Sequence, residues 1–397
     1  MLDEQLMNGF PPTKNAQVTL DNWRIPPFNR WAFQHVRELV PSGEISRGDG
    51  PVWQLDRNPV NLMQTGFTTS AGIETDVQGF LEATQADGFL VMHNAKIVTE
   101  HYTNDFTAAC PHILMSVSKS LTATLAGLFV CEDRINTDTR VAEVIPEIKG
   151  SAFEDCTLQH ILDMTVGVDF SEDYLARDGL ITQYREVSGW KPPSPGNVEG
   201  DLRSWLGKLR KTGEHGHQFH YVSPCTDLLG WILERLGGRP FHELFSELIW
   251  QPMGAEYDAY VTVDRFGAPR TAGGICVTLR DLARFGQMLL QGGNVNGHQI
   301  VPAQWIAETQ TNLNTSAWKA GSGTEFLPHG GYHNKWWIVG NNHDAYTGIG
   351  VYGQWLYIDP TASVVIAVNS SQPLPLDDIV SIDSLSCFNA IVSSLAA

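Results

Sequence analysis

The hydrophobic pattern of β-strands occurs towards both ends of the chain. Two apolar runs, 88–92 and 96–102, flank the turn His93-Asn94-Ala95, which predicts a β-hairpin. Four further runs of strand character follow late in the sequence, at 334–339, 346–352, 354–359 and 363–368. Strands at both ends with helical sequence between them predict one antiparallel sheet that the two ends build together.

Helical periodicity dominates the rest of the pattern. Apolar residues spaced three and four positions apart predict helices at 74–84, 116–131, 157–164, 227–236 and 376–395. A further helix is expected to begin at the capping box Thr278-Leu279-Arg280-Asp281, with Leu282, Phe285 and Leu289 facing inward. The expected fold class is therefore α/β of the α+β type, an antiparallel sheet flanked by helices with a helix-rich insertion.

Three regions are expected along the chain. Residues 1–70 are rich in Pro, Asn and Trp and weakly periodic, which predicts an extension that wraps the core. Residues 71–150 and 250–397 are expected to form the α/β domain with the central sheet. Residues 151–249 are expected to form a helix-rich domain in which 166–200 is an irregular loop.

Composition narrows the class of protein. The 397 residues are 42% hydrophobic and 18% charged, which excludes a disordered chain. With 26 basic and 44 acidic residues the formal charge is −18, and such a surface repels phosphate backbones and anionic lipids. Nucleic-acid and membrane partners are therefore not expected, and no apolar run of roughly 18–20 residues that could cross a bilayer is identified.

Cysteine usage and the first residues bear on the compartment. The six cysteines are scattered without a C-x-x-C pair, unlike a disulfide scaffold or a zinc site. The start Met1-Leu2-Asp3-Glu4 lacks the basic and apolar regions of a signal peptide. A cytoplasmic protein is expected, with a homodimer left open.

The most informative chemistry lies in Ser116-Val117-Ser118-Lys119. On a helix, positions i and i+3 share a face, so the Ser116 hydroxyl and the Lys119 amine can meet. A serine becomes a nucleophile when a base activates it, and a lysine can be that base if burial lowers its pKa. At a helix N-terminus the Ser116 N–H could also stabilise an oxyanion. The pattern alone is common, so it needs supporting residues.

Two later motifs supply such support. Tyr221-Val222-Ser223 follows an apparent strand end at 218–220, and a tyrosine phenol can relay protons between nucleophile, lysine and leaving group. The segment 348–354, Gly-Ile-Gly-Val-Tyr-Gly-Gln, is expected on a late strand. Its glycines would let a substrate lie against the strand, and one of its N–H groups could complete an oxyanion hole.

In order and rough spacing, the three motifs resemble those of the serine β-lactamase-like superfamily. Two longer segments, 157–168 and 273–293, are similar to family segments as well. Within the superfamily the chain most resembles the 6-aminohexanoate-dimer (nylon-oligomer) hydrolases and related carboxylesterases. The residues that carry this closer resemblance are Asn29 to Phe33, Leu114 to Ser116, Ser171 to Tyr174 and the pair Trp336-Trp337.

The resemblance implies a serine β-lactamase-like fold and a metal-independent, cofactor-free serine hydrolase acting on small esters or amides. Ser116 would be acylated, with Lys119 as base and Tyr221 as proton relay. The N–H groups of Ser116 and Val351 would form the oxyanion hole. Six residues would contact substrate: Tyr174 at the scissile amide, Trp190 and Trp337 along the acyl pocket, and the motif residues Ser223, Tyr352 and Gly353.

The sequence departs from the family pattern in ways that affect specificity. An acidic loop position that holds the substrate amine in nylon-oligomer hydrolases is Arg185 here, and an amide-bearing position before the Gly-Gly pair is Ala272. These changes put amino-terminated oligomers in doubt and leave simple esters unaffected. Tyr352 stands where a β-lactamase has the lysine of K-T-G, so strong β-lactamase activity is not expected.

Other readings stay open or are set aside. A D-amino-acid peptidase or penicillin-binding protein, and a non-catalytic binding protein on the same fold, remain alternatives. The Gly348-x-Gly350-x-x-Gly353 spacing also matches a dinucleotide fingerprint, but a strand rather than a helix is predicted after it. Glu214, His215, His217 and His220 suggest a metal site, yet a solvated loop is the favoured interpretation. No G-x-S-x-G occurs, which excludes nucleophile-elbow hydrolases.

Overall fold

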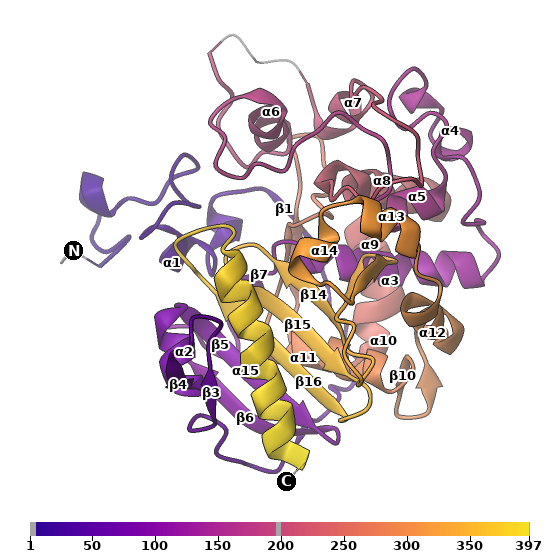
Figure 1. The fold of residues 1–397 in the computed structure, drawn as a ribbon. Coiled ribbons are helices and arrows are strands. Elements are labelled where there is room, and N and C mark those ends of the chain that lie inside the picture. Colours follow the sequence, from indigo (N-terminus) through magenta and orange to yellow (C-terminus); the bar gives the residue numbers. More distant parts are fainter. Residues whose placement is uncertain (1–4, 196–199, 397) are drawn as a thin grey trace.

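An eight-stranded sheet at the centre joins the two ends of the chain (Figure 1). The computed structural model describes residues 5–195 and 200–396. The strand order is β12-β13-β14-β15-β16-β5-β6-β2. The strands are β12 (Gly331–His333), β13 (Trp336–Ile338), β14 (Tyr346–Gly350), β15 (Gln354–Asp359), β16 (Val364–Ser370), β5 (Ala86–His93), β6 (Lys96–Tyr102) and β2 (Asp56–Arg57). All neighbours pair antiparallel except β2 with β6, so the predicted sheet is confirmed.

The junction of the two chain ends is the pairing of β16 with β5, where Ile366 lies opposite Val91. The predicted hairpin is present as β5 and β6, and its turn residues Asn94 and Ala95 both have positive φ, 51° and 61°. Two such residues form a tight turn whose twist matches that of the flanking strands. The sheet is thus formed by local hairpins and one long-range pairing.

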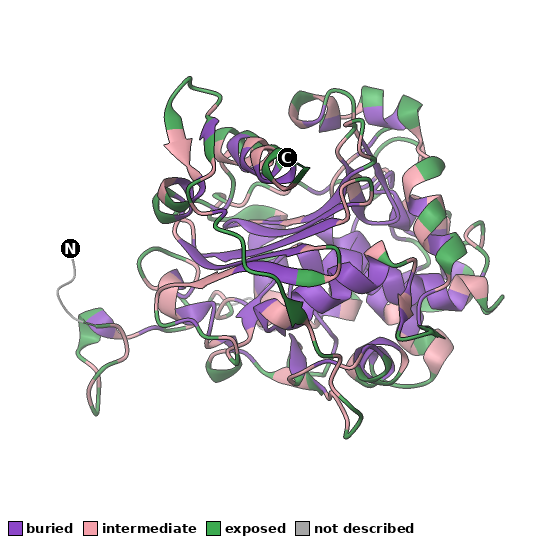
Figure 2. Cartoon of the chain, turned by 90° about the horizontal axis from the view of Figure 1, so that it is seen from below, coloured by how far each residue is buried: buried purple, intermediate pink, exposed green. Residues whose placement is uncertain are grey.

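Helices cover both faces of this sheet, which explains why β16 is buried throughout. Val364, Ile366 and Val368 point to one layer, where they meet α15 (Asp378–Ala396) and α2 (Val77–Ala83). The alternate residues Val365 and Ala367 point to the other layer, formed by α3 (Val117–Cys131) and α11 (Leu279–Leu290). Because side chains alternate along a strand, each layer receives every second residue. Figure 2 shows the buried residues concentrated in the sheet and the helices beneath it.

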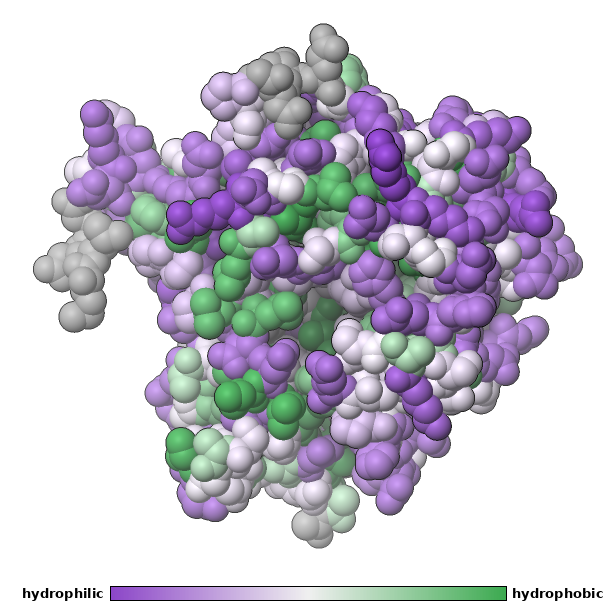
Figure 3. Space-filling view, turned by 45° about the horizontal axis from the view of Figure 1, so that its top comes forward, coloured by the Kyte–Doolittle hydropathy of each residue, from purple (hydrophilic) through white to green (hydrophobic). Residues whose placement is uncertain are grey.

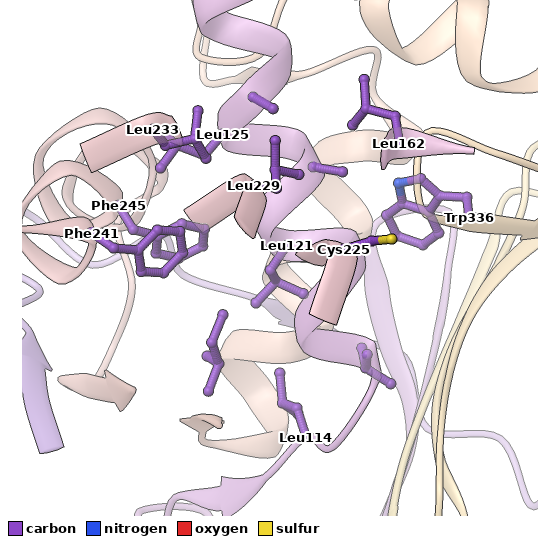
Figure 4. Packing of buried hydrophobic residues seen from close by; sticks show 14 of the residues in the cluster. Leu114, Leu121, Leu125, Leu162, Cys225, Leu229, Leu233, Phe241, Phe245 and Trp336 are labelled. Carbon is purple, nitrogen blue, oxygen red and sulfur yellow. The ribbon is translucent and has the colours of Figure 1, made fainter. Parts of the chain in front are cut away.

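The helix α3 is the centre of the second layer. Figure 4 shows Leu121 and Leu125 of α3 facing Leu229 and Leu233 of α8 (Ser223–Gly237). The helix α8 begins four residues before the predicted start at 227 and ends at Gly238, which has a φ of +67°. Glycine adopts this left-handed conformation without the strain that a side chain would add, so the predicted stop is confirmed.

The remaining helices surround these layers. The helical middle contains α4 (Val141–Val144), α5 (Leu158–Leu162), α6 (Gly179–Val187), α7 (Leu202–Leu206), α9 (Phe241–Phe245), the π-helix η4 (Ser246–Trp250) and α10 (Gln251–Met253). Elsewhere lie α1 (Asn29–Ala32), α12 (Ala303–Thr311), α13 (Thr315–Ala320), α14 (Gly323–Phe326) and the 3-10 helices η1 (Lys14–Ala16), η2 (Val36–Glu38) and η3 (Pro146–Ile148). Thr278 caps α11 by accepting from the Asp281 N–H, as predicted. The divisions at residues 70, 151 and 249 stay a prediction.

Several short strands were not predicted. A second sheet has the order β1-β8-β9-β7, built from β1 (Ser42–Ile45), β8 (Ala259–Thr262), β9 (Ile275–Val277) and β7 (His112–Ile113). Two small hairpins are β3 (Gly66–Thr68) with β4 (Glu74–Asp76), and β10 (Asn294–Val295) with β11 (His298–Gln299). Strands of two to four residues are too short for a period-2 pattern to be recognised.

Three predicted elements were wrong in detail. The region 166–200, expected as an irregular loop, contains the helix α6. The helix expected at 74–84 begins only at Val77, because β4 occupies 74–76 and Asp76 caps α2 by accepting from the Gly79 N–H. The strand end expected at 218–220 is an extended segment outside any sheet, whose Phe219 and His220 N–H groups donate to the carbonyls of Ala317 and Met164.

The expectation that no stretch is long and apolar enough to cross a bilayer is also wrong, because one helix has the length and the composition for it. The helix α15 has 19 residues and a mean hydropathy of 1.5 in its most apolar window. In this structure α15 packs against the sheet, with Phe388 edge-on to Trp355 at 5.5 Å. Its buried residues Cys387, Phe388, Ile391 and Val392 therefore contribute to the core.

The N-terminal segment lies against the region that carries the motifs. Trp23 Nε1 donates to the Trp190 carbonyl at 3.0 Å, and Asn29 Nδ2 donates to the carbonyls of Ser371 and Gln372. Trp23 and neighbouring apolar side chains form one buried cluster with Trp190 and Tyr352. The segment is thus an integral part of the core.

Candidate active site

Ser116 sits at the turn between β7 and α3. Met115 before it has a φ of +45°, and Ser116 itself is the N-cap of α3. A non-glycine residue with positive φ is strained, and such strain is held in place by surrounding structure. Here the Leu114 N–H is anchored to the Ile275 carbonyl at 2.9 Å. The turn therefore presents both the hydroxyl and the N–H of Ser116 at the helix start.

Lys119 lies one turn further along α3, as its spacing predicted. Its Nζ is 2.7 Å from Ser116 Oγ and 2.8 Å from the Ala272 carbonyl oxygen. The side chain is 1% exposed, and burial lowers the pKa of Lys119 from 10.5 to about 7. Nearby Glu172 acts in the opposite direction and raises it. About half of the lysines are therefore neutral at pH 7 and able to accept the Ser116 proton.

Tyr221 completes the triad of predicted catalytic side chains. Its hydroxyl hydrogen-bonds with Ser116, and Lys119 Nζ lies 4.9 Å from the centre of its ring. Burial raises the pKa of Tyr221 well above its usual value of 10. The phenol is therefore neutral throughout the physiological range and can donate or relay a proton.

The end of β14 lies directly against the nucleophile. A Cβ on Gly350 would lie 3.0 Å from the Ser116 nitrogen and 2.6 Å from the Leu114 carbonyl, so only glycine allows this approach. Neither the Ser116 N–H nor the Val351 N–H has a hydrogen-bond acceptor among the residues that the structure describes. Both residues line the same pocket. Two free N–H groups there can hold a developing oxyanion.

A cavity of about 320 Å³ opens above Ser116. An aromatic wall borders it, in which the Trp337 ring stacks on Tyr221 at 5.5 Å and 28°. The predicted site residues that line this cavity are Ser116, Tyr174, Tyr221, Trp337, Val351 and Gly353. Figure 3 shows a hollow of this kind with apolar residues beside it. The lining suits a small substrate with apolar groups around the reacting carbonyl.

Glu172 is a pocket residue that sequence reasoning did not assign. Its Oε1 accepts a hydrogen bond from the Ser223 N–H, and it bonds to the hydroxyl of Tyr174. Its second oxygen, Oε2, is buried without a hydrogen-bond partner in the described structure. In the sequence, Glu172 stands out only as part of the segment Ser171 to Tyr174, because no local pattern indicates that this loop lies near Ser116.

Comparisons with known proteins agree with this geometry. The family model described as Beta-lactamase matches residues 73–383. A 6-aminohexanoate-dimer hydrolase of Paenarthrobacter ureafaciens is 35% identical over 371 residues, which cover 92% of this chain and 91% of that protein.

The chain belongs to the β-lactamase family.

The solved structures support this assignment. One from Bacillus anthracis, described as a 6-aminohexanoate-dimer hydrolase, has a TM-score of 0.88 and 30% identity and covers 97% of this chain and 98% of its own. A family VIII carboxylesterase shares the fold alone, with a TM-score of 0.56 and 16% identity, over 78% of this chain and 95% of its own. The predicted resemblance is thus confirmed, and this family member is a serine hydrolase of the type that acts on esters or amides.

A buried ion pair lies next to Lys119 in this β-lactamase-family hydrolase. Asp227 pairs with Arg270, and its Oδ1 accepts from the Ala272 N–H at 2.8 Å. The Ala272 carbonyl is the group that Lys119 contacts, so the pair holds the peptide that positions the lysine. Asp227 and Arg270 were not predicted, because a charged residue in a helix or loop is usually exposed.

Three predicted substrate residues do not line the cavity. Trp190 is 6% exposed, donates from Nε1 to Thr262 Oγ1 at 3.0 Å and packs against Trp23 with ring centres 5.2 Å apart. Tyr352 points into the cluster of the N-terminal segment, with its ring 5.1 Å from that of Phe33. Ser223 is the first residue of α8, where it holds Glu172 through its N–H. All three shape the site from outside the pocket.

Arg185 also takes an unexpected part in this site. Its guanidinium donates to the carbonyl of Tyr174 at 2.8 Å and to that of Ala176 at 3.2 Å. It therefore anchors the loop that places Tyr174 at the pocket.

Two other patterns noted in the sequence have a structural explanation. His215 accepts from the Gly167 N–H at 3.0 Å, and its other ring nitrogen lies 3.0 Å from Asp155. After Gly353 the chain continues as strand β15, which is not the helix that a dinucleotide fingerprint needs.

Proposed function

We propose that this hydrolase cleaves small neutral carboxylic esters through an acyl-enzyme on Ser116. The observation that carries the proposal is the buried Lys119 Nζ 2.7 Å from Ser116 Oγ, with its pKa lowered to about 7. A lysine with this pKa can remove the serine proton at neutral pH.

Acylation follows from the three side chains. Neutral Lys119 takes the Ser116 proton while Oγ bonds to the ester carbonyl carbon, and the carbonyl oxygen becomes an oxyanion held by the N–H groups of Ser116 and Val351. The oxyanion then re-forms the carbonyl, and the bond to the leaving alkoxide breaks. Tyr221 gives its proton to the leaving oxygen and is reprotonated by Lys119.

Deacylation runs through the same groups in reverse. A water takes the place of the leaving alcohol and gives a proton to Tyr221 or Lys119 as it attacks the acyl carbon. The tetrahedral intermediate then expels Ser116 Oγ, which takes the proton back, and the free acid leaves. The enzyme returns to its starting protonation state.

The charge of the pocket argues against the runner-up, a β-lactam-directed enzyme or D-amino-acid peptidase. Such substrates carry a carboxylate that needs a cation near the nucleophile. In the described part of the chain the pocket is lined by no lysine or arginine, whereas Glu172, Glu325, Asp377 and Asp378 line it. A negative rim disfavours an anionic substrate.

The test is intact mass after incubation with a fluorophosphonate probe, followed by hydrolysis of p-nitrophenyl acetate. We expect one adduct on the wild type and on Ser316→Ala, an exposed serine on α13 that serves as the matched control. Ser116→Ala should give neither adduct nor turnover. An adduct on Ser116→Ala, or none on the wild type, would overturn the proposal and favour a non-catalytic binding protein.

A further inference from the structure

The pocket above Ser116 does not end at the reacting groups. It continues from Val351 towards the loop before α15 and the first turns of that helix, where Leu376, Val380 and Ile382 line it. Ser116 and Tyr221 line this cavity together with residues of α15. A substrate held at Ser116 therefore has a second, separate surface within reach.

This second surface is apolar and uncovered. Leu376 is 55% exposed and Ile382 is 38% exposed, and their neighbours Leu374 and Ile379 are 47% and 62% exposed. We call these four residues the α15 rim. Leu376 and Ile382 line the cavity itself, and exposed large aliphatic side chains gathered at a cavity mark a binding surface. Figure 3 shows apolar surface gathered beside the hollow on the face in view.

The serine hydroxyls in the same turns of α15 already donate hydrogen bonds to backbone carbonyls. Ser381 Oγ donates to the Asp377 carbonyl at 2.9 Å, and Ser384 Oγ donates to the Val380 carbonyl at 2.8 Å. Because both hydroxyl protons are used within the helix, these serines present mainly carbon to the cavity. Asp377 is occupied too, since its Oδ1 accepts from the Val380 N–H at 3.1 Å.

We infer that the α15 rim binds the aliphatic acyl chain of a medium-chain ester, with about six to eight carbons, while its carbonyl sits at Ser116; the inference rests on the proposed function. We expect this acyl chain to carry no charge, because Glu325, Asp377 and Asp378 border the same cavity and would repel a carboxylate on it. The same charges favour release of the anionic acid product.

The acyl side is assigned by the position of the proton donor. Tyr221 must contact the leaving oxygen, so the alcohol lies towards the aromatic wall of Tyr221, Phe219 and Trp337. This places Trp337 beside the alcohol and not along the acyl pocket, where the family resemblance puts it. The oxyanion occupies the N–H groups of Ser116 and Val351. The remaining substituent of the tetrahedral carbon is the acyl chain, and the apolar part of the cavity left for it is lined by Leu376, Val380 and Ile382.

The size of the effect follows from apolar burial. Each buried methylene should raise kcat/KM about fourfold until the chain extends past the α15 rim. Acetate is too short to reach this surface, whereas hexanoate and octanoate reach it. The ratio of kcat/KM for octanoate to that for acetate therefore measures the contact of the acyl chain with the α15 rim.

The test compares p-nitrophenyl acetate, butyrate, hexanoate and octanoate for the wild type, Leu376→Asn and Ile382→Asn. Phe266→Asn, a 67% exposed residue outside this pocket, is the matched control. We expect the octanoate-to-acetate ratio of kcat/KM to fall at least tenfold in both rim variants and to stay at the wild-type value in the control. A complete fluorophosphonate adduct on each variant shows that its active site has folded.

A second substrate series separates the two ends of the cavity. Acetate esters of ethanol, butanol and hexanol vary the alcohol and keep the acyl group short. If the rim variants change this series and leave the acyl series unaltered, the assignment of the acyl chain is wrong. A flat acyl series in a wild type that does hydrolyse p-nitrophenyl acetate overturns this inference alone. Absence of Ser116-dependent hydrolysis overturns the proposed function instead.

Discussion

The protonation of Lys119 should set the pH dependence of acylation. Only neutral Lys119 can accept the Ser116 proton, so kcat/KM should rise with pH and reach half of its maximum near pH 7. A lysine with the ordinary pKa of 10.5 is neutral in only about one molecule in 3,000 at pH 7, because 10.5 − 7 = 3.5 pH units separate the two. Burial thus accounts for a gain of about three orders of magnitude in the active form.

Two substitutions should move this midpoint in opposite directions. Glu172 stabilises the ammonium form of Lys119, so Glu172→Gln should lower the midpoint. Lys335 is a second buried lysine, whose pKa burial lowers to about 8, and its charge disfavours protonation of Lys119. Lys335→Met should therefore raise the midpoint. The assay is kcat/KM for p-nitrophenyl acetate between pH 5 and 9 at constant ionic strength.

Lys119→Arg is the control, because arginine keeps the charge and cannot lose its proton in this range. We expect it to lose at least three orders of magnitude in kcat/KM at every pH. A profile that stays flat from pH 5 to 9 in the wild type, or equal shifts of the same sign in both variants, would refute the role of Lys119 as base.

Three further predictions concern the same molecule. Tyr221→Phe should lower kcat for p-nitrophenyl acetate about 10²- to 10³-fold with little change in KM, since only the proton relay is removed; a normal kcat would contradict it. Gly350→Ala should lower kcat about 10²- to 10³-fold and also lower the thermal stability, because its Cβ would lie 3.0 Å from the Ser116 nitrogen and 2.6 Å from the Leu114 carbonyl oxygen; full activity would mean that the oxyanion hole lies elsewhere. Leu229→Ala, in the interface of α3 and α8, should reduce the free energy of unfolding in urea by about 2–5 kcal/mol, and a change below about 1 kcal/mol would show that this interface is not tightly packed.

Elements that rest on local pattern were predictable. The hairpin of β5 and β6, the helix α3 and the capped start of α11 depend on residues within a few positions of one another. The contact of Ser116 with Lys119 is of the same kind, because one helical turn brings positions i and i+3 together. The order of motifs then sufficed to identify the family.

The surroundings of the triad depend instead on long-range packing. Lys119 meets the Ala272 carbonyl across 153 positions, and Asp227 of α8 accepts a hydrogen bond from the N–H of the same residue. The reach of the Glu172 loop to Ser223, and of α15 to the pocket, has no local signature. Trp190 and Tyr352 were expected to contact the substrate, but both side chains pack in the cluster of the N-terminal segment.

The sequence by itself therefore determined which residues can react, since a nucleophile, a base and a proton relay are defined by residue type and local spacing. The tertiary structure alone decided how they react and on what. Burial sets the pKa of Lys119, and the close approach of Gly350 brings the end of β14 against the Ser116 nitrogen. Both depend on neighbours that only the folded chain brings together, because desolvation and contact are properties of the packed volume and leave no periodic trace in the sequence.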